Sequence, residues 1–362
     1  MKFIHIADMH FDAPFVTLAG KGNLAQERRL EQRKVMKEIV KYIKENNISY
    51  FFIAGDFYEQ DYIRKSTIEY INNLFKEIEN TKIFITPGNH DPYIKNSFYK
   101  QYKWNKNVHI FTNELERVEN EEVDIYGYGF NDFYMENNYK KIQIYNKEKI
   151  NILITHGNLD NGKDENKPYN PLTTKQLNEL NFDYVALGHI HKRSYNDCKN
   201  QKIVYPGSTI SLGFDELGER GIIQGEINED TRELKLKFIP TSAKTFEEKE
   251  LDVSNINSEE ELIETIKNLN LDENKYYKII LVGKCNFNFE EKRVLELSNI
   301  ENLIKIRNHT KEKYDIEEVS IQSNLKGLFA KRILEKMNAE TDLEEKQKLL
   351  EAFEIGMEVL NK

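Results

Sequence analysis

The sequence predicts an α/β fold in which strands alternate with helices. Three runs rich in β-branched and aromatic residues, at 3–7, 50–54 and 82–86, have the length and composition of buried strands. Between them, at 24–46 and 67–79, apolar residues recur with the helical period. Strands that alternate with such helices are typical of a βαβ layout. We therefore expect buried central strands covered by helices.

Each expected helix has its own sequence support. The helix at 24–46 places the following apolar residues on one face: Val35, Met36, Ile39, Val40 and Ile43. The helix at 67–79 does the same with another set: Ile68, Ile71, Leu74, Phe75 and Ile78. Ser66 with Glu69 is a capping-box pattern that predicts the start of this helix, and Thr173 with Gln176 predicts a further helix start. Runs at 150–155 and 184–187 add two strands.

The composition is that of a globular protein without a membrane segment or secretory signal. The longest apolar runs have strand length, far below the roughly 20 residues of a membrane helix, and the N-terminus lacks a signal pattern. The two cysteines, Cys198 and Cys285, lie far apart, so we expect no disulfide framework and a cytoplasmic protein. The net charge of −9 argues against a general nucleic-acid binder but permits a locally basic groove.

Metal-binding side chains follow all five of these strand-like runs. In chain order they are Asp8 and His10, Asp56, Asn89 with His90 and Asp91, His156, and finally His189 and His191. Open α/β sheets bind ligands beyond the carboxyl ends of their strands. We therefore expect these side chains to meet at one site.

Seven of them supply oxygen or nitrogen ligands: Asp8, His10, Asp56, Asn89, His156, His189 and His191. Seven ligands are too many for one tetrahedral zinc and suit two divalent ions that share a carboxylate. Donors of this mixed kind, without thiolate, suit Mn, Fe or Zn better than copper or an iron–sulfur cluster. Two ions about 3.5–4 Å apart can hold a hydroxide for attack on a phosphoryl group. A purely structural cluster is disfavoured because several unpaired buried charges would be costly.

These motifs, in this order, resemble those of the calcineurin-like metallophosphoesterase superfamily. They read DxH at 8–10, GD at 55–56, GNHD at 88–91, His-Gly at 156–157 and GHxH at 188–191. Within the superfamily, FIHIADMHFDAPF at the start and YPGSTISLGFDELGERG at 205–221 are similar to SbcD-type DNA repair exonucleases, especially the YhaO-like members. The resemblance implies a sandwich of two mixed β-sheets flanked by helices, followed by a small α/β capping domain and C-terminal helices. The corresponding boundaries are 1–245, 246–312 and 313–362.

The resemblance also implies a role for each site residue. One ion is held by Asp8, His10, Asp56 and His191. The other is held by Asp56, Asn89, His156 and His189, so that Asp56 bridges the two. His90 acts on the scissile phosphate or the leaving oxygen, and Asp91 either orients His90 or caps the next turn. The expected ions are Mn²⁺, with Mg²⁺, Fe²⁺ and Zn²⁺ as alternatives. Purple acid phosphatases carry a metal-binding tyrosine where this chain has Glu59, so we expect no iron–tyrosinate site.

The function implied is a two-metal DNA nuclease, a 3′-to-5′ exonuclease on double strands with endonuclease ability on single strands. Two alternatives stay open: a phosphodiesterase for cyclic or small nucleotides, and a DNA-binding or scaffolding subunit whose metals are structural. Basic residues that follow strand ends are expected at the mouth of the cleft, where they would contact DNA phosphates: Arg28, Arg29, Arg64, Lys65, Lys192 and Arg193. The alternative for these charges is an ordinary solvated helix face.

The C-terminal residues 324–362 predict two helices and a protein partner. Leu343, Leu350 and Met357 recur every seven residues, with Phe353 and Leu360 between, which is the narrow seam of a helix that meets another helix. The chain lacks a P-loop ATPase motif, and the resemblance implies a separate SMC-like, SbcC-type ATPase that binds these helices. The alternative is a hairpin that folds back on the capping domain. A second copy of the chain is the other protein partner considered, and no membrane is expected.

Overall fold

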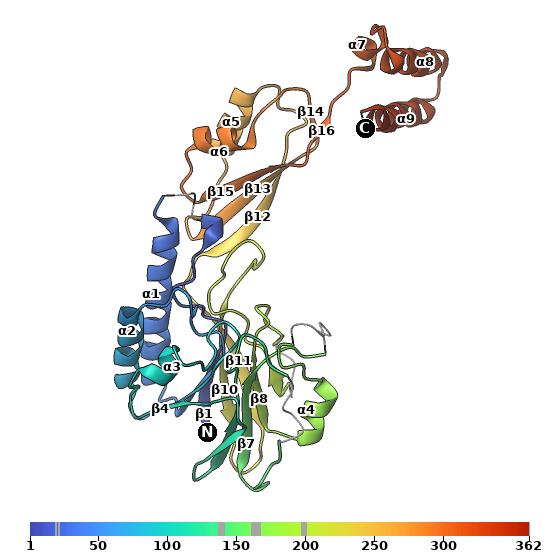
Figure 1. Ribbon diagram of the computed structural model, residues 1–362. Coiled ribbons are helices and arrows are strands. Elements are labelled where there is room, and N and C mark those ends of the chain that lie inside the picture. Colours follow the sequence, from blue (N-terminus) through green and yellow to red (C-terminus); the bar gives the residue numbers. More distant parts are fainter. Residues whose placement is uncertain (19, 21, 137–141, 161–167, 197–200, 362) are drawn as a thin grey trace. The chain divides into compact units, whose positions relative to one another are not determined.

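The computed structural model describes residues 1–361 except 19, 21, 137–141, 161–167 and 197–200 (Figure 1). The chain forms two compact units, Met1–Glu247 with Asp272–Tyr276, and Glu248–Leu271 with Tyr277–Lys362. Residues 313–362, which the sequence suggested as a separate segment, therefore group with the preceding α/β region. Each helix within the described part of the chain is too short or too polar to cross a bilayer.

The first unit contains a mixed six-stranded sheet in the order β11-β10-β1-β2-β3-β4. Its parallel strands are β1 (Lys2–Ile6), β2 (Tyr50–Ala54), β3 (Lys82–Thr86) and β4 (Val108–Ile110). The antiparallel edge is β10 (Gly221–Ile227) with β11 (Leu234–Pro240). The strands expected at 3–7, 50–54 and 82–86 are thus confirmed as neighbours at the centre of this sheet.

A second sheet of the same unit has the order β5-β6-β7-β8-β9. Its strands are β5 (Glu116–Glu119), β6 (Val123–Gly127), β7 (Ile150–His156), β8 (Tyr184–Gly188) and β9 (Ile203–Val204). From β6 to β9 they run parallel, and β5 is antiparallel to β6. The expected strands at 150–155 and 184–187 are its two central members.

The alternation of side chains along β2 shows how the layers pack. Phe51 and Ile53 point into a core shared with α1 (Leu24–Glu45) and α2 (Lys65–Lys76). Phe52 and Ala54 point the other way, into a core shared with strands of the second sheet. On the outer face of that second sheet lies α4 (Thr174–Leu180) (Figure 1). The expected sandwich of two mixed sheets flanked by helices is confirmed. Short helices η1 (Val16–Leu18) and α3 (Phe98–Gln101) complete the unit.

One helix start was predicted correctly and one wrongly. Thr173 and Gln176 form the expected reciprocal capping box of α4. The N-cap of α2 is Arg64 rather than Ser66. Asp12 takes over the capping role, because its carboxylate accepts hydrogen bonds from the Arg64 amide (3.1 Å) and the Thr67 hydroxyl (2.6 Å). A distant side chain has therefore replaced the local capping box.

The second unit is built on a sheet of β12 (Thr245–Asp252), β13 (Lys275–Val282) and β15 (Leu303–Asn308). Helices α5 (Glu259–Lys267) and α6 (Glu291–Ser298) bury Leu262 and Val294 in its core. The short strands β14 (Lys284–Cys285) and β16 (Lys311–Glu312) pair in parallel. Cys285 is a free, buried cysteine, and Cys198 lies outside the described residues.

The chain of this unit ends in three helices, α7 (Ile316–Ser320), α8 (Leu325–Ala339) and α9 (Leu343–Leu360). Phe353 and Met357 of α9 are buried in a small core with Phe329 of α8. Lys284 and Lys311 form ion pairs with Glu354 and Glu358 of α9. Part of the seam predicted to meet a partner is therefore covered by the chain's own helix.

Candidate metal centre

Five strand ends converge in the first unit and bring the seven predicted ligands together. Asp8 and His10 follow β1, Asp56 follows β2, and Asn89 follows β3, all from the first sheet. His156 ends β7, and His189 with His191 follows β8 in the second sheet. The two sheets present their carboxyl ends on the same side, so the ligands form two clusters that meet at Asp56.

The first cluster consists of Asp8, His10 and His191, whose ligand atoms lie within 4.8 Å of one another. Nδ1 of His10 is 2.7 Å from a carboxylate oxygen of Glu59, and Nδ1 of His191 is 2.5 Å from one of Glu216. Because carboxylates accept, both imidazoles carry their proton on Nδ1 and leave a lone pair on Nε2. The two Nε2 atoms face each other at 3.1 Å. Two such nitrogens beside a buried carboxylate can share a proton or hold a cation between them.

The second cluster consists of Asp56, His156 and His189, again with ligand atoms within 4.8 Å. His156 donates from Nδ1 to the Ala54 carbonyl (2.9 Å), which turns Nε2 toward Asp56 Oδ2 at 3.3 Å. Asn89 Oδ1 lies 3.1 Å from His156 Nε2 and 3.0 Å from His189 Nδ1. Asp56 Oδ2 is also 3.9 Å from His10 Nε2. Asp56 therefore lies between the clusters, as a bridging ligand must.

The electrostatics of the buried histidines agree with a site that binds cations. Burial lowers the pKa of His156, but the carboxylates of Asp56 and Asp8 outweigh it and raise this pKa to about 9. Burial is likewise outweighed at His191, where Glu216 and Asp8 raise the pKa to about 9. In contrast, burial and the neighbouring His156 lower the pKa of His189 to about 3. The carboxylates of the centre therefore stabilise positive charge on His156 and His191. A divalent ion would bind at the same nitrogen atoms and would compete with these protons.

The backbone around the centre is strained. Asp8, His10, Asp56 and His189 have φ values of 50°, 48°, 48° and 104°, in the region that non-glycine residues rarely adopt. Such strain persists where the surrounding structure holds a functional geometry. At Gly88 an added Cβ would lie only 2.2 Å from Asp56 Oδ1, so only glycine permits this approach to the central carboxylate.

His90 lies at the exposed rim of the centre, next to the first cluster. Its side chain is 46% exposed, and its ring meets that of His10 edge-on at 4.9 Å. Nδ1 donates to Glu59 Oε2 at 3.0 Å. This hydrogen bond is the main cause that raises the pKa of His90 to about 9. Burial alone would raise the pKa of Glu59, but the hydrogen bonds from His10 and His90 lower it to about 2. An imidazolium at His90 and a carboxylate at Glu59 are therefore the stable forms near neutral pH.

Asp91, the second catalytic residue expected from the sequence, lies beneath the centre between the loops after β2 and β3. It is fully buried, and its carboxylate accepts hydrogen bonds from the amides of Gly88 (2.6 Å) and Phe57 (2.7 Å) and from the Tyr99 hydroxyl (2.5 Å). Burial, followed by the charge of Asp56, raises its pKa to about 6. The Asp91 carboxylate therefore ties the loops after β2 and β3 together. Glu59 is the residue that orients His90.

Three residues of the centre were not predicted. Glu59 was noted only as a departure from another family's pattern, although its position three residues after Asp56 could have signalled a role. Glu216 lies inside the 205–221 motif and also accepts from the Ser208 hydroxyl (2.6 Å). Asn170 donates to the His156 carbonyl (2.8 Å) and carries no sequence signal.

The predicted DNA-contacting residues differ in their placement. Arg28 is fully buried, and this prediction is wrong: it pairs with Glu31 and donates to the Ser211 carbonyl (2.8 Å). Arg29 is half-buried, with Nη1 3.4 Å from the Ala13 carbonyl. The remaining four side chains are exposed: Arg64, Lys65, Lys192 and Arg193. Lys65 pairs with Glu69 (3.6 Å), and the Arg193 guanidinium lies 3.7 Å from the centre of the Phe238 ring.

The fold and the site define a class of protein. A family model of the calcineurin-like phosphoesterases matches residues 1–193, and the chain belongs to this family of metal-dependent phosphoester hydrolases. It is similar to the uncharacterized metallophosphoesterase YhaO of Bacillus subtilis, with 25% identity over 231 residues. That match covers 61% of this chain and 56% of YhaO, so it spans little more than half of the relative. A solved structure, TT1561 of Thermus thermophilus, is 11% identical, with a TM-score of 0.37, over 66% of this chain and 98% of that one.

Proposed function

We propose that this protein is a nuclease that hydrolyses phosphodiester bonds of DNA with two divalent metal ions, most readily Mn²⁺. The observation that carries the proposal is Asp56, which lies between two clusters of ligands while His90 stands exposed beside them. Two bound ions would supply a hydroxide nucleophile and neutralise charge on the phosphate.

Residues of the chain would position the reacting groups and donate the proton. Asp56 holds the clusters together, and its Oδ1 accepts a hydrogen bond from the His90 amide (2.8 Å), which positions that residue. His90, protonated below about pH 9, can donate to a phosphate oxygen or to the leaving oxygen. Glu59 keeps the His90 ring oriented and charged through the 3.0 Å hydrogen bond.

Two observations favour DNA over other phosphodiesters. The 205–221 motif, similar to that of SbcD-type nucleases, is part of the centre, because Glu216 and Arg220 both hydrogen-bond to His191. Arg64, Lys65, Lys192 and Arg193 are exposed cations on loops and helix starts after the strands that carry the ligands. The same resemblance supports 3′-to-5′ exonuclease action on duplex ends and endonuclease action on single strands.

The test compares substrates under manganese: linear duplex DNA, single-stranded DNA, bis-p-nitrophenyl phosphate and cyclic nucleotides. We expect release of nucleotides from DNA, its loss after chelation, and its loss in His90→Ala with metal content retained. Turnover of small diesters without any cleavage of DNA would favour the alternative, a phosphodiesterase for small or cyclic nucleotides. DNA binding without turnover of any ester would favour the scaffolding alternative.

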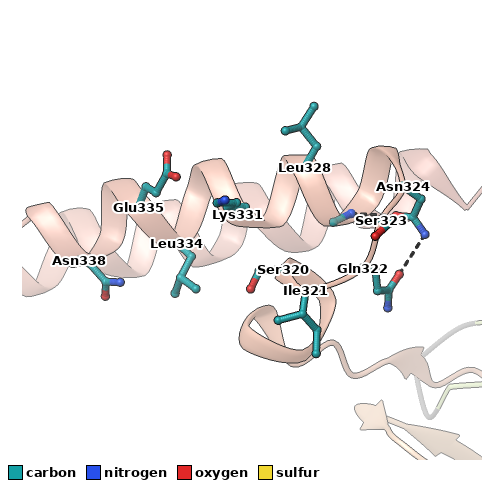
Figure 2. A pocket seen from close by; sticks show the side chains of 11 residues that line it. Ser320, Ile321, Gln322, Ser323, Asn324, Leu328, Lys331, Leu334, Glu335 and Asn338 are labelled. Carbon is teal, nitrogen blue, oxygen red and sulfur yellow. Dashed lines mark hydrogen bonds between the residues drawn. The ribbon is translucent and has the colours of Figure 1, made fainter.

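We further propose that the C-terminal helices bind an SMC-like ATPase. Because Phe353 and Met357 are covered by α8, the proposed surface shifts to α8 and the residue that follows α7. There Leu325, Leu328 and Ile321 are 67%, 58% and 81% exposed. A groove of about 760 Å³ between α8 and the turn at 320–324 includes Ile321, Leu328 and Leu334 (Figure 2). Exposed apolar residues of this density are typical of a partner surface.

The partner proposal is tested with Leu325→Asp combined with Leu328→Asp. The double variant should fold normally and lose co-purification with the ATPase, while Ile355→Asp, equally exposed on α9 at 64%, retains it. Full binding by the double variant would place the partner elsewhere.

A further inference from the structure

Glu59 lies between two imidazoles, and one of them stands at the exposed rim of the metal centre. Its Oε1 faces Nδ1 of His10 at 2.7 Å, and its Oε2 faces Nδ1 of His90 at 3.0 Å. A ligand atom from each of these three residues lies within 4.8 Å of the other two. His10 serves the first cluster through Nε2, which faces His191. A third group of potential metal ligands therefore adjoins the two clusters assigned to the reaction.

The backbone fixes Glu59 and His90 relative to each other. The Gln60 amide donates to the His90 carbonyl (3.0 Å), and the Glu59 amide donates to the Phe11 carbonyl (3.0 Å). The Glu59 side chain is 16% exposed, whereas that of His90 is 46% exposed. An ion that arrives from solvent thus meets a carboxylate that is already ordered, which lowers the entropy lost on binding.

The pair formed by Glu59 and His90 has a geometry suited to zinc. Tetrahedral zinc with ligand distances of about 2.0–2.1 Å separates its ligand atoms by about 3.3 Å. The distance of 3.0 Å from His90 Nδ1 to Glu59 Oε2 needs to open only slightly to reach that value. The ion takes the place of the proton that Nδ1 now donates, and water molecules complete its coordination. Imidazole suits Zn²⁺, and Zn²⁺ precedes Mn²⁺ in the general order of divalent-ion affinity.

We propose that Glu59 and His90 form an inhibitory zinc site at the rim of the metal centre. The site deepens the proposed function, on which it rests, because His90 is the proton donor there. With zinc on Nδ1, the only proton left on the ring is the one on Nε2, and its loss would leave an imidazolate. Zinc-bound His90 therefore no longer serves as a general acid, and turnover falls while both manganese ions stay in place.

The experiment adds zinc to the full-length, manganese-loaded protein and counts the bound ions. Equilibrium dialysis followed by plasma mass spectrometry gives zinc and manganese per chain, and electron paramagnetic resonance detects manganese released into solution. Turnover of bis-p-nitrophenyl phosphate is measured in the same samples. We expect about one additional zinc ion per chain, no release of manganese, and a fall in turnover of about 100-fold at saturation, as is typical when a general acid is lost.

Variants separate the rim site from the catalytic pair of ions. His90→Ala should retain both manganese ions and lose the additional zinc. Glu59→Gln, at saturating manganese, should bind that zinc more weakly because a neutral amide oxygen replaces the carboxylate. His109→Ala is the matched control, since His109 also lies 3.1 Å from a glutamate, Glu116, but that side chain is 44% exposed. This control should still bind the additional zinc.

Zinc that binds only as manganese is released would overturn the proposal, because the inhibition would then reflect exchange at the catalytic pair. Retention of the additional zinc by His90→Ala would overturn it too, and additional zinc bound at full turnover would refute the inhibitory role. Failure to cleave DNA would refute the nuclease proposal separately, since the zinc count and the turnover of a small diester do not depend on DNA.

Discussion

Glu59 accepts hydrogen bonds from two histidines at once, 2.7 Å from Nδ1 of His10 and 3.0 Å from Nδ1 of His90. One of these rings belongs to the first ligand cluster and the other stands at the exposed rim. A single carboxylate therefore couples the geometry of the metal site to the orientation of the proposed proton donor. The first two predictions follow from this coupling.

Glu59→Gln should lower kcat about 10- to 100-fold and weaken manganese binding by a similar factor, as is usual when a hydrogen-bond partner of a metal ligand is lost. The amide can still accept one hydrogen bond but no longer balances an imidazolium. Steady-state kinetics at saturating manganese and a manganese titration would measure the two effects. Glu69→Gln, an exposed glutamate of α2, is the control. Unchanged kinetics in Glu59→Gln would show that His90 needs no such partner.

The pH dependence of activity should show a loss at high pH. The pKa of His90 is raised from 6.5 to about 9 because the Glu59 carboxylate stabilises the imidazolium. The protonated form is therefore complete below the unperturbed value and is lost as the pH rises through about 9, so kcat/KM should fall there. In Glu59→Gln the same fall should move to lower pH. A pH–rate profile with an identical descending limb in both proteins would exclude His90 as the titrating group.

Asp56→Ala should prevent the binding of a metal pair and abolish turnover, because this carboxylate lies between both clusters. Metal content by mass spectrometry, together with the spin-coupled electron paramagnetic resonance signal of a manganese pair, would report the loss. Asp61→Ala, an exposed aspartate of the loop after β2, should bind and turn over normally. DNA cleavage at full rate by a folded Asp56→Ala protein would refute the bridging assignment.

Asp91→Asn should destabilise the fold by about 1–3 kcal/mol, because the amide group would turn a donor toward backbone amides that now donate to a buried carboxylate. Urea unfolding would measure the difference, with Tyr99→Phe as a milder change that removes only the donated hydroxyl. An unchanged unfolding midpoint in Asp91→Asn would mean that the carboxylate does not hold these loops.

Arg28 and the exposed cations should behave differently toward DNA. Arg28→Met should lower the free energy of unfolding by about 3 kcal/mol, since it leaves Glu31 without its buried partner. It should not change the salt dependence of DNA binding.

Neutralising four exposed cations together, Arg64, Lys65, Lys192 and Arg193, should instead change that salt dependence. The slope of log K against log salt should become shallower by up to about 0.9 per lost phosphate contact. Fluorescence anisotropy over a range of salt would measure it. An unchanged slope in the quadruple variant would place the phosphate path elsewhere.

The sequence by itself determined the elements that depend on local pattern. The strands at 3–7, 50–54 and 82–86 could be predicted because apolar β-branched and aromatic runs must be buried, and their position between helical patterns implied a layered α/β fold. The candidate ligands could be predicted for a related reason. Each follows such a run directly, and the carboxyl ends of strands in these folds converge.

Contacts between distant parts of the chain were decided only by the tertiary structure. Arg28 and Ser211 are 183 residues apart, so no local pattern could show that packing buries this arginine. The heptad seam of α9 predicted a helix that meets another helix, but the pattern cannot say which one. Phe353 and Met357 are covered by α8, whereas Leu343 at the start of the seam is exposed. In the same way, Glu59 and Glu216 contact the histidines of the centre only because folding brings these residues together. The sequence determines which chemical group each side chain carries. Its hydrogen-bond partners and its exposure depend on how both sheets pack.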